Sequence, residues 1–476
     1  MPFRHWNFRS CLLKDNIHKV RKRNNMGKLK WRIILVIALW LVFCGMASAV
    51  ELHVGSGQTY STIRGAVDVA GDGDVIIVHA GSYTEHVSVA KRLTLLGEGA
   101  DVVTVTAAVT SEHIFYVAAD YVNISGFTVT GATGYYSISG IYLDNVEHCN
   151  ISDNNASNND YGIYLQHSSS NTLENNTVNS NDHCGIRMSS SDNNNLANNT
   201  ASDNSCGIYQ VDSSSNVLTE NIANSNNNYG IYLQHSSSNT LENNTVNSNN
   251  DSGIYLYYYS SNNNIIGNTA SNNSDNDEGI GIYVGYSDNN NLEKNTMNLN
   301  NYGIHLHYSR NNDITCNLVH KNSDSGFCLT DSSTDNIIEH NNIVENGNYN
   351  STSGGWEWDF YNDQGCIVEA RNNYWGTPDN DIVDASIYDD DESTNVYRLV
   401  RFYPPAGEPV PCAPIPIPEL HGDVNHDGKL STTDAVLALQ MAVGGIDTDL
   451  AADMNSDGKI TSLDALMILQ AAAENI

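Results

Sequence analysis

Two stretches near the C-terminus repeat the same oxygen-bearing residues at the same spacing. They are DVNHDGKLSTTD at 423–434 and DMNSDGKITSLD at 453–464, offset by 30 residues. Positions 1, 3, 5, 9 and 12 carry side-chain oxygens, and a glycine stands at position 6, as in a calcium loop that also uses the carbonyl at position 7. The predicted ligands are Asp423, Asn425, Asp427, Lys429 (carbonyl), Ser431 and Asp434, then Asp453, Asn455, Asp457, Lys459 (carbonyl), Thr461 and Asp464. Two copies predict two Ca²⁺ ions.

A second group of reactive side chains lies in the middle of the chain. Asp182, His183 and Arg187 bring a carboxylate, an imidazole and a guanidinium within six residues. Such groups serve acid–base chemistry, whereas glycoside hydrolysis needs two carboxylates a few Å apart. We take these three residues as the catalytic candidates. The alternative is a repeat unit whose sequence has drifted.

A third group is aromatic. Six tyrosines stand two residues after a glycine, at Tyr142, Tyr164, Tyr209, Tyr232, Tyr255 and Tyr283. Aromatic faces in a row predict a carbohydrate-binding strip, with neighbouring Asn, Gln and Ser available for sugar hydroxyls. The alternative is stacking of the rings on one another, which stabilises a sheet without a ligand.

The elements that must position these groups follow from a repeat. Its marker glycines are spaced by 22 to 28 residues and are Gly140, Gly162, Gly185, Gly207, Gly230, Gly253, Gly281, Gly303 and Gly326. Residues 161–181 recur identically at 229–249. Apolar residues one and three positions after each glycine flank a polar-tolerant position, which indicates strands with the apolar pair inside and the Tyr row outside. A period of this kind predicts a solenoid.

Asparagine follows the same period. One row stands 14 residues after most marker glycines, as at Asn176 and Asn221, and a second follows five residues later, as at Asn181 and Asn226. Asn accepts left-handed backbone at corners, and stacked Asn side chains can bond to the coils above and below. Because disorder needs no such register, the rows favour a solenoid over a disordered segment.

This repeat resembles the right-handed parallel β-helix of pectate-lyase-like proteins, and especially NosD-type repeats. STIRGAVDVAGDGDVIIVHAGSYTEHVSV at 61–89 resembles the opening of such folds, with a capping helix at about 61–70, and NNYWGTPDNDIVDASIYDD at 372–390 resembles their last coil. The resemblance implies a mostly β single-stranded solenoid of about 22–23 residues per coil over 51–403. As the class includes polysaccharide lyases and O-glycosyl hydrolases, it implies one of these activities if the chain is an enzyme. The NosD name suggests copper handling, but the sequence contains no cluster of His and Met residues with the spacing of copper ligands.

The C-terminal stretches also resemble a family. A duplicated calcium loop followed by an apolar helix, with Asp at position 12 and no helix before each loop, resembles a type I dockerin over 421–476. The resemblance implies docking to a cohesin domain. It further implies that loop positions 10 and 11, Thr432, Thr433, Ser462 and Leu463, help choose that partner. A calcium-stabilised fold without a cohesin partner is the alternative.

The charge of the chain excludes one class of partner. With 22 Lys and Arg against 55 Asp and Glu, the net charge of −33 excludes nucleic acid as a partner.

The N-terminal segment predicts the compartment. Basic residues precede an apolar run at 33–46 and the small residues Ala47-Ser48-Ala49, which predicts a signal segment over 1–49 with a start at Met26 as one option. A retained anchor is the alternative, and no later stretch predicts a membrane span.

Other features complete the organisation. Proline-rich residues 404–420 predict a stiff spacer between the β-helix at 50–403 and the dockerin. Cys184 and Cys206 are candidates for a disulfide one coil apart, although an odd number of cysteines after the signal segment argues against a complete framework. The insertion at 274–279 is a candidate cation loop or a solvated loop. Trp356, Trp358 and Trp375 indicate a cap over the last coil or a binding patch.

The combined prediction is a secreted or cell-surface protein. Its β-helix binds or presents at polysaccharide, and its dockerin docks to a cohesin. Two alternatives stay open: a polysaccharide lyase or glycoside hydrolase, and a structural surface or adhesion rod without catalysis.

Overall fold

The computed structural model describes residues 49–134, 137–274, 279–364, 366–389, 399–414, 422–424, 429–443, 450–455 and 459–474. Three predictions fall on residues outside these ranges: the signal segment up to Ser48, the acidic residues of the 274–279 insertion (Asp275, Asp277 and Glu278), and three calcium ligands (Asn425, Asp427 and Asp457). From Glu51 onward the described residues belong to one compact unit.

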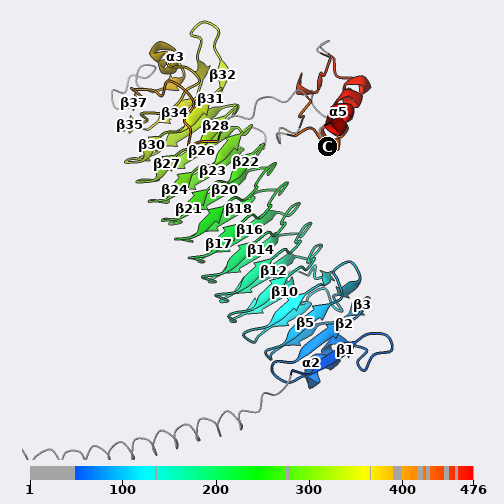
Figure 1. The fold of residues 1–476 in the computed structure, drawn as a ribbon. Helices are drawn as coiled ribbons and strands as arrows, with labels where there is room; N and C mark the ends of the chain where they lie inside the picture. The colour runs from blue at the N-terminus through cyan, green and yellow to red at the C-terminus, as the bar shows by residue number, and fades with distance from the viewer. Residues whose placement is uncertain are drawn as a thin grey trace, which may run out of the picture. The chain divides into compact units, whose positions relative to one another are not determined.

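Strands stack in parallel to form a β-helix, as predicted, and its coils have three faces (Figure 1). Sheet I has 13 strands: β1 (Glu51–Val54), β2 (Val75–Val78), β5 (Thr94–Gly97), β8 (Asn123–Ser125), β11 (Asn150–Ser152), β13 (Thr172–Glu174), β15 (Asn195–Ala197), β17 (Val217–Thr219), β19 (Thr240–Glu242), β21 (Asn264–Ile266), β24 (Asn291–Glu293), β27 (Asp313–Thr315) and β30 (Ile337–Glu339).

Sheet II also has 13 strands: β4 (Val87–Val89), β7 (Phe115–Val117), β10 (Ser139–Asp144), β12 (Tyr161–Gln166), β14 (Cys184–Ser189), β16 (Cys206–Val211), β18 (Ile231–Gln234), β20 (Ser252–Tyr257), β23 (Ile280–Gly285), β26 (Tyr302–His307), β29 (Ser325–Thr330), β34 (Phe360–Asp363) and β36 (Ile387–Tyr388).

The third face consists of two short parallel sheets. They contain β3 (Gly81–Thr84), β6 (Val103–Thr106) and β9 (Thr128–Thr130), then β22 (Thr269–Ser271), β25 (Thr296–Asn298), β28 (Leu318–His320) and β31 (Asn342–Val344). Single bridges from Thr128 to Thr269 join the two across the intervening coils. Two further pairs lie near the C-terminal end of the β-helix: β32 (Asn348–Tyr349) with β33 (Trp356–Glu357), and β35 (Val368–Glu369) with β37 (Val400–Arg401).

The marker glycines set the register of sheet II. Ile163 pairs with Ile186 and Leu165 with Met188, so equivalent residues of successive coils lie side by side, and all four are fully buried. A Cβ atom at Gly207 would lie 2.5 Å from the carbonyl oxygen of Gly230 in the next coil. Close approach between coils therefore explains why the position is glycine.

Three ladders of buried asparagines run along the coils, two of which the sequence predicts. In each ladder the side-chain oxygen of one Asn accepts bonds from the backbone N–H and, at most steps, the amide NH₂ of the Asn one coil earlier; Asn199 and Asn221 lie 3.0 Å apart in both contacts. The ladders comprise Asn154 to Asn373, Asn159 to Asn346, and the unpredicted third, Asn171 to Asn336. The bonding between coils is confirmed.

The asparagines of the ladders do not themselves adopt the left-handed backbone conformation. It belongs to the residue before each one, such as Asn198 (φ +54°) or Glu220 (φ +55°). The expectation that the row asparagines adopt this conformation is therefore wrong. The preceding residue makes the sharp bend, and the Asn side chain is thereby directed inward, where it satisfies the carbonyls and amides of the corner.

The first coil is capped by a helix at the predicted place. Helix α2 (Ile63–Val69) starts at Thr62, whose hydroxyl accepts from the N–H of Gly65. The Glu85 carboxylate accepts from the N–H groups of the first two helical residues, Ile63 and Arg64. At the other end, the Lys91 ammonium donates to the carbonyls of residues 67, 68 and 70. A carboxylate at the N-terminus and a cation at the C-terminus complement the helix dipole.

The C-terminal end of the β-helix includes part of the predicted spacer. Cys412 forms a disulfide with Cys316, and Asn342 bonds to the N–H of Val410 and the carbonyl of Pro414. Residues 404–414 thus contact the last coils instead of forming a free spacer. Of the three tryptophans, Trp375 is buried against the core, and helix α3 (Asn380–Asp384) lies nearby in the chain.

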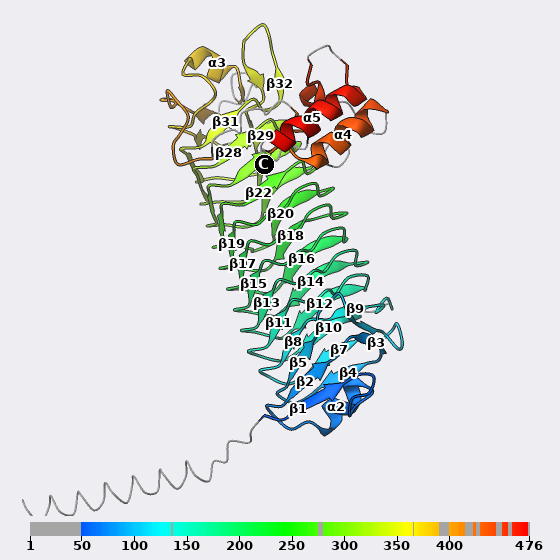
Figure 2. The same ribbon diagram turned by 45° about the vertical axis from the view of Figure 1, so that its right-hand side comes forward.

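The described part of the C-terminal module contains α4 (Thr432–Ala442), a short 3₁₀ helix, η1 (Leu450–Ala452), and α5 (Ser462–Glu474). Figure 2 shows α4 and α5 next to each other. Their shared core consists of Val424, Ala435, Ala438, Met441, Ala452, Ala465 and Ile468. The two predicted loop–helix units therefore pack into one small core.

One ladder ends on a carboxyl group, and this ending predicts a pH effect. Asp359 accepts from both the N–H and the NH₂ of Asn346 at 2.9 Å, and burial raises the pKa of Asp359 from 3.8 to about 8. Ionising it inside the fold costs free energy, so the stability that the protonated group contributes is complete below about pH 4 and is lost as the pH rises through about 8.

Replacing Asp359 with Asn is therefore expected to raise the Tm of the β-helix at pH 7–9 and to change it little at pH 4. Between the two pKa values the difference grows by at most about 1.4 kcal/mol per pH unit. Thermal unfolding followed by circular dichroism at several pH values measures it. Asp313→Asn, at an exposed strand position, is the control; equal pH profiles for Asp359→Asn and wild type would contradict the prediction.

Candidate functional site

Each predicted calcium loop is held by the carboxylate at its last position. Oδ2 of Asp434 accepts from the N–H and the hydroxyl of Ser431 at 2.8 Å, and Oδ1 accepts from the N–H of Val424. The Ser431 hydroxyl also caps α4, so the loop and the helix share one set of bonds. Asp423, at the first position, is buried beside this network.

The second loop repeats this arrangement. Oδ2 of Asp464 accepts from the N–H and hydroxyl of Thr461, at 2.9 and 2.8 Å, while Oδ1 is buried with no hydrogen-bond partner among the described residues. Asp453 is buried as well. The buried Oδ1 of Asp464 fits a hard cation such as Ca²⁺, which prefers six to eight oxygen ligands. The first loop has carboxylate, amide and hydroxyl residues at the same spacing, so its donor set is of the same kind.

The residues expected to choose a partner are exposed. Thr432, Thr433, Ser462 and Leu463 all lie on the surface at the start of α4 and α5. Exposed apolar side chains continue from them along each helix. They are Val436 and Leu439 on α4, Val443 directly after it, and Leu466 and Leu469 on α5. Both helices thus keep an apolar surface outside their shared core.

On the β-helix, the predicted Tyr row lies on the outer face of sheet II, but its rings are covered more than expected. Tyr142, Tyr164 and Tyr283 are at most 9% exposed, and the other three are half-buried. The ring centroids of Tyr209 and Tyr232 are 4.7 Å apart. Burial raises the pKa of Tyr209 to about 12, so its phenol stays protonated. Most ring surface of the Tyr row is therefore covered by neighbouring rings of the same face.

The three catalytic candidates, Asp182, His183 and Arg187, do not form one site. His183 and Arg187 lie on this face, whereas Asp182 is exposed beside them and its side chain joins neither. Instead, Nδ1 of His183 contacts Oδ1 of Asp160 at 2.5 Å, and the imidazole stacks on the ring of Tyr161. The Asp160 side chain is only 5% exposed, while that of His183 is 59% exposed.

Arg187 completes this cluster. Its Nη1 donates to the Tyr161 hydroxyl at 3.0 Å, and its guanidinium lies over the rings of Tyr161, Tyr164 and Tyr209 at 5.1 to 5.6 Å. No carboxylate pairs with it within the described part of the chain. We name Asp160, Tyr161, His183 and Arg187 the His183 cluster.

Sequence reasoning missed Asp160 and Tyr161, although a signal was present. Both stand at the positions of His183 and Cys184 one coil earlier, two and one residues before a marker glycine. Aligning whole coils, and not only the residues after glycine, brings them together. Cys184 pairs with Cys206 in the register of the strands, yet both thiols are free, so the candidate disulfide is not formed.

Comparison with known proteins identifies both parts. Two overlapping matches to the family model described as "Periplasmic copper-binding protein (NosD)" span residues 98–276 and 222–380, more than half of the chain. The chain belongs to the NosD family. A second model, described as "Dockerin type I domain", matches residues 421–471 of this NosD-family protein.

One curated relative is a cell surface glycoprotein of Methanothermus fervidus. It is 32% identical over 133 residues, which are 27% of this chain and 21% of that protein. The NosD-family chain thus matches about a fifth of that relative's length.

Solved structures share the fold. The Dettilon tailspike protein aligns at 18% identity and a TM-score of 0.51 over 57% of this chain and 61% of its own. The A-module of a mannuronan C-5 epimerase of Azotobacter vinelandii aligns at 15% identity and a TM-score of 0.47, over 59% of this chain and 93% of its own. At such identities the likeness concerns the fold alone.

The family description names copper, which proteins bind through His, Cys and Met side chains. Across the described ranges, no group of three or more His, Cys, Asp or Glu side chains has the arrangement to hold a metal ion. The described His, Cys and carboxylate side chains therefore form no cluster that fits copper. In the same ranges, no helix has the length and apolar character to cross a bilayer.

Proposed function

We propose that this NosD-family protein is exported, that its dockerin docks to a cohesin with two Ca²⁺ ions in its loops, and that its β-helix binds polysaccharide. The observation that carries the proposal is the pair of matching loop–helix units, each with a buried carboxylate bonded to its own loop. A dockerin fixes the rest of its chain to a scaffold, so the β-helix is the part left to meet an external ligand.

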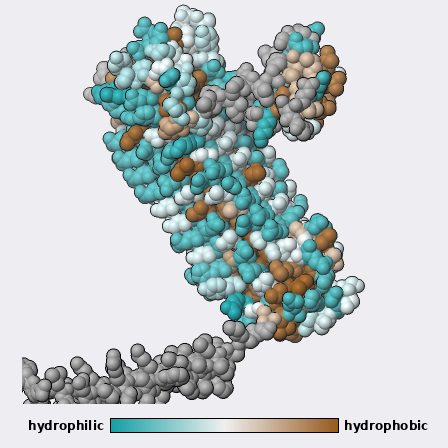
Figure 3. Space-filling model, in the orientation of Figure 1, coloured by the Kyte–Doolittle hydropathy of each residue, from teal (hydrophilic) through white to brown (hydrophobic). Residues whose placement is uncertain are grey.

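Two features support a carbohydrate ligand for the β-helix. The outer face of sheet II is aromatic along successive coils, and the remaining surface is largely hydrophilic, as Figure 3 shows for one face. The curated cell-surface relative supports a location outside the cell. Proposed contacts are the half-buried rings of the Tyr row, Tyr209, Tyr232 and Tyr255, with the exposed loop residues Thr432, Thr433, Ser462 and Leu463 contacting the cohesin.

A pull-down tests the docking. The full chain is expected to be captured by immobilised cohesins in Ca²⁺ and released by a chelator. Leu463→Ala together with Leu466→Ala, both exposed on α5, is expected to weaken capture at least 10-fold, while the exposed change Gln440→Ala on α4 serves as control. Capture that is unaffected by chelation and by the double change would refute the docking role.

The His183 cluster favours a second function, cleavage of an acidic polysaccharide by a lyase. A buried carboxylate orients the His183 imidazole as a general base, and Arg187, which no described carboxylate neutralises, suits the carboxylate of a uronic acid. Incubation with polygalacturonate and alginate, followed by absorbance of unsaturated products, tests it. Activity that is lost in His183→Ala would support the lyase; no product with wild type would exclude it.

A further inference from the structure

A corner of the β-helix carries tyrosines that the functions above do not use. The corner follows each strand of sheet II, five residues after the marker glycine, and three successive coils place Tyr258, Tyr286 and Tyr308 there. Their rings form a column: centroids are 5.1 Å apart for Tyr258 and Tyr286 and 5.0 Å for Tyr286 and Tyr308, with interplanar angles of 11° and 19°. With the adjoining Tyr257 and Tyr259 they form what we call the corner strip.

Three of the five rings of the corner strip are open to solvent, unlike any ring of the Tyr row, whereas Tyr257 and Tyr286 are half-buried. Tyr259 is 72% exposed, Tyr308 42% and Tyr258 39%. Tyr257 packs against Tyr258 at a centroid distance of 4.2 Å and reaches Tyr255 of the Tyr row at 5.5 Å. The strip therefore extends the aromatic surface of sheet II onto the corner, where ring edges and hydroxyls are accessible.

Backbone geometry does not explain the choice of tyrosine. Tyr258, Tyr286 and Tyr308 have φ of +43°, +51° and +48°, in the left-handed region. The same corner in the other coils holds Asn145, His167, Ser190, Asp212, His235 or Asp331. A bulky residue in this region costs about 1–3 kcal/mol, and Asn costs less. Three tyrosines in consecutive coils therefore occupy the corner in spite of its conformation, which points to a use for their rings.

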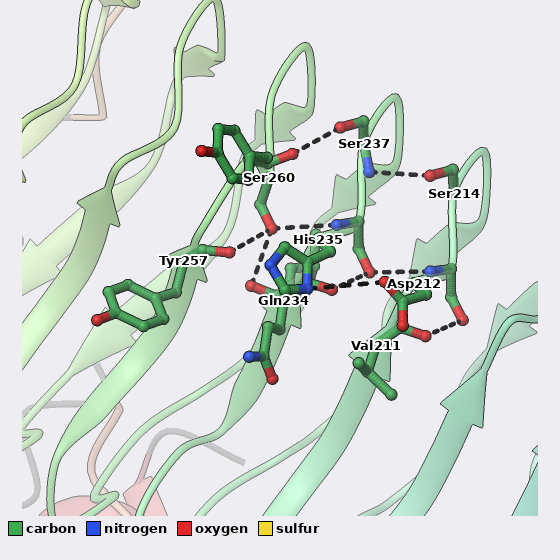
Figure 4. Close-up of polar contacts among 12 residues, drawn as sticks. Val211, Asp212, Ser214, Gln234, His235, Ser237, Tyr257 and Ser260 are labelled. Carbon is green, nitrogen blue, oxygen red and sulfur yellow. Dashed lines mark hydrogen bonds and ion pairs between the residues drawn. The ribbon is translucent and has the colours of Figure 1, made fainter.

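The charges around the strip decide which ligand it suits. On the N-terminal side of the column, Asp212 and His235 lie 3.6 Å apart. On the C-terminal side, Asp331 and His307 lie 3.2 Å apart. Figure 4 shows the lower end, where the Tyr257 ring points away from the bonded serines. The nearby Arg310 donates to the carbonyl of Ser332, and the N–H of Arg310 donates to Asp288. An anionic chain would meet three carboxylates here.

We propose that the corner strip binds an uncharged polysaccharide chain that lies along the stack of coils. The C–H faces of sugar rings pack on the exposed tyrosine surface, and phenol hydroxyls bond sugar hydroxyls. Coils follow one another every ~4.8 Å, which approaches the length of one sugar unit. The proposal rests on the proposed polysaccharide binding and assigns it to the corner, where the rings are open.

The test uses a triple change that suits the corner. Tyr258, Tyr286 and Tyr308 are replaced together by Asn, which the left-handed backbone accepts, so Tm is expected to stay or rise. Kd for xyloglucan, mannan and xylan, and for the anionic polygalacturonate, is measured by affinity electrophoresis of the full chain. The triple variant is expected to bind the neutral glycans at least 10-fold more weakly. His167→Asn, at the same corner four coils earlier, is the matched control.

Each outcome separates the two proposals. Wild type that binds none of the polysaccharides overturns both the proposed polysaccharide binding and the corner strip. Unchanged neutral-glycan binding in the triple variant, or wild-type binding confined to polygalacturonate, overturns the corner strip only. If the triple variant fails to fold, Tyr259→Ala, at the most exposed ring, gives the answer: a loss of at least 3-fold supports the strip, and no loss overturns it.

Discussion

Replacing Asn221 with Ala is expected to destabilise the β-helix by about 3–6 kcal/mol. The Asn221 side chain accepts from the N–H and NH₂ of Asn199 and donates to the Leu196 carbonyl and to Oδ1 of Asn244, all at 2.9–3.0 Å. It is fully buried, so no water replaces these bonds. Each buried polar group left without a partner costs about 1–3 kcal/mol, and Ala leaves several in two neighbouring coils.

Guanidinium unfolding of the full chain, followed by the strand signal in circular dichroism, measures this cost. Asn227→Ala removes the same atoms from an exposed position of the same coil and is expected to change stability by less than about 0.5 kcal/mol. Similar unfolding midpoints for the two variants would mean that the ladder does not stabilise the coils.

Chelation of Ca²⁺ is expected to unfold the dockerin and leave the β-helix intact. Asp423, Asp434, Asp453 and Asp464 are all buried in a small module with one modest core. A cation bound among these four carboxylates neutralises their charge, so much of the free energy of folding should come from metal binding. The β-helix depends on backbone and Asn ladders, which contain no metal ligand.

The full chain should therefore lose its helical circular dichroism and its cohesin binding in chelator, and keep its strand signal and main thermal transition. Asp434→Ala and Asp464→Ala, each in one loop, should reduce the Ca²⁺ stoichiometry from two to one. Exposed Asp381→Ala is the control. Helical signal that survives chelation would count against calcium-dependent folding.

The strict spacing of glycine, Ile and Leu was sufficient to predict the coils, their register and the inward residues, because neighbouring coils must match position by position. The Asn ladders were predicted in part: the row at Asn171 to Asn336 follows the Ser-rich corner, where Asn looked like one polar residue among many. The disulfide between Cys316 and Cys412 joins residues 96 apart. No repeat spacing relates them, so the sequence carried no signal for it.

The candidate sites were harder, because outward residues obey fewer constraints. A side chain that alternates outward can still be covered by its neighbours, as Tyr164 is by Tyr142 and Tyr161. Likewise, the carboxylate that contacts His183 is that of Asp160 in the preceding coil, and not that of the adjacent Asp182. The calcium loops differ, since all six expected ligand positions lie within one short segment, so the spacing alone predicts a site.

The Asn ladders also give the β-helix a direction. Wherever amide bonds to amide, the NH₂ group points toward the C-terminal end and the oxygen toward the N-terminal end, so the side-chain dipoles add along the axis. A coil can join such a stack only head to tail, and any added coil with Asn at the three corners continues all ladders without a new interface. Gene duplication can therefore lengthen this protein by whole coils, as the identical segments 161–181 and 229–249 suggest it has.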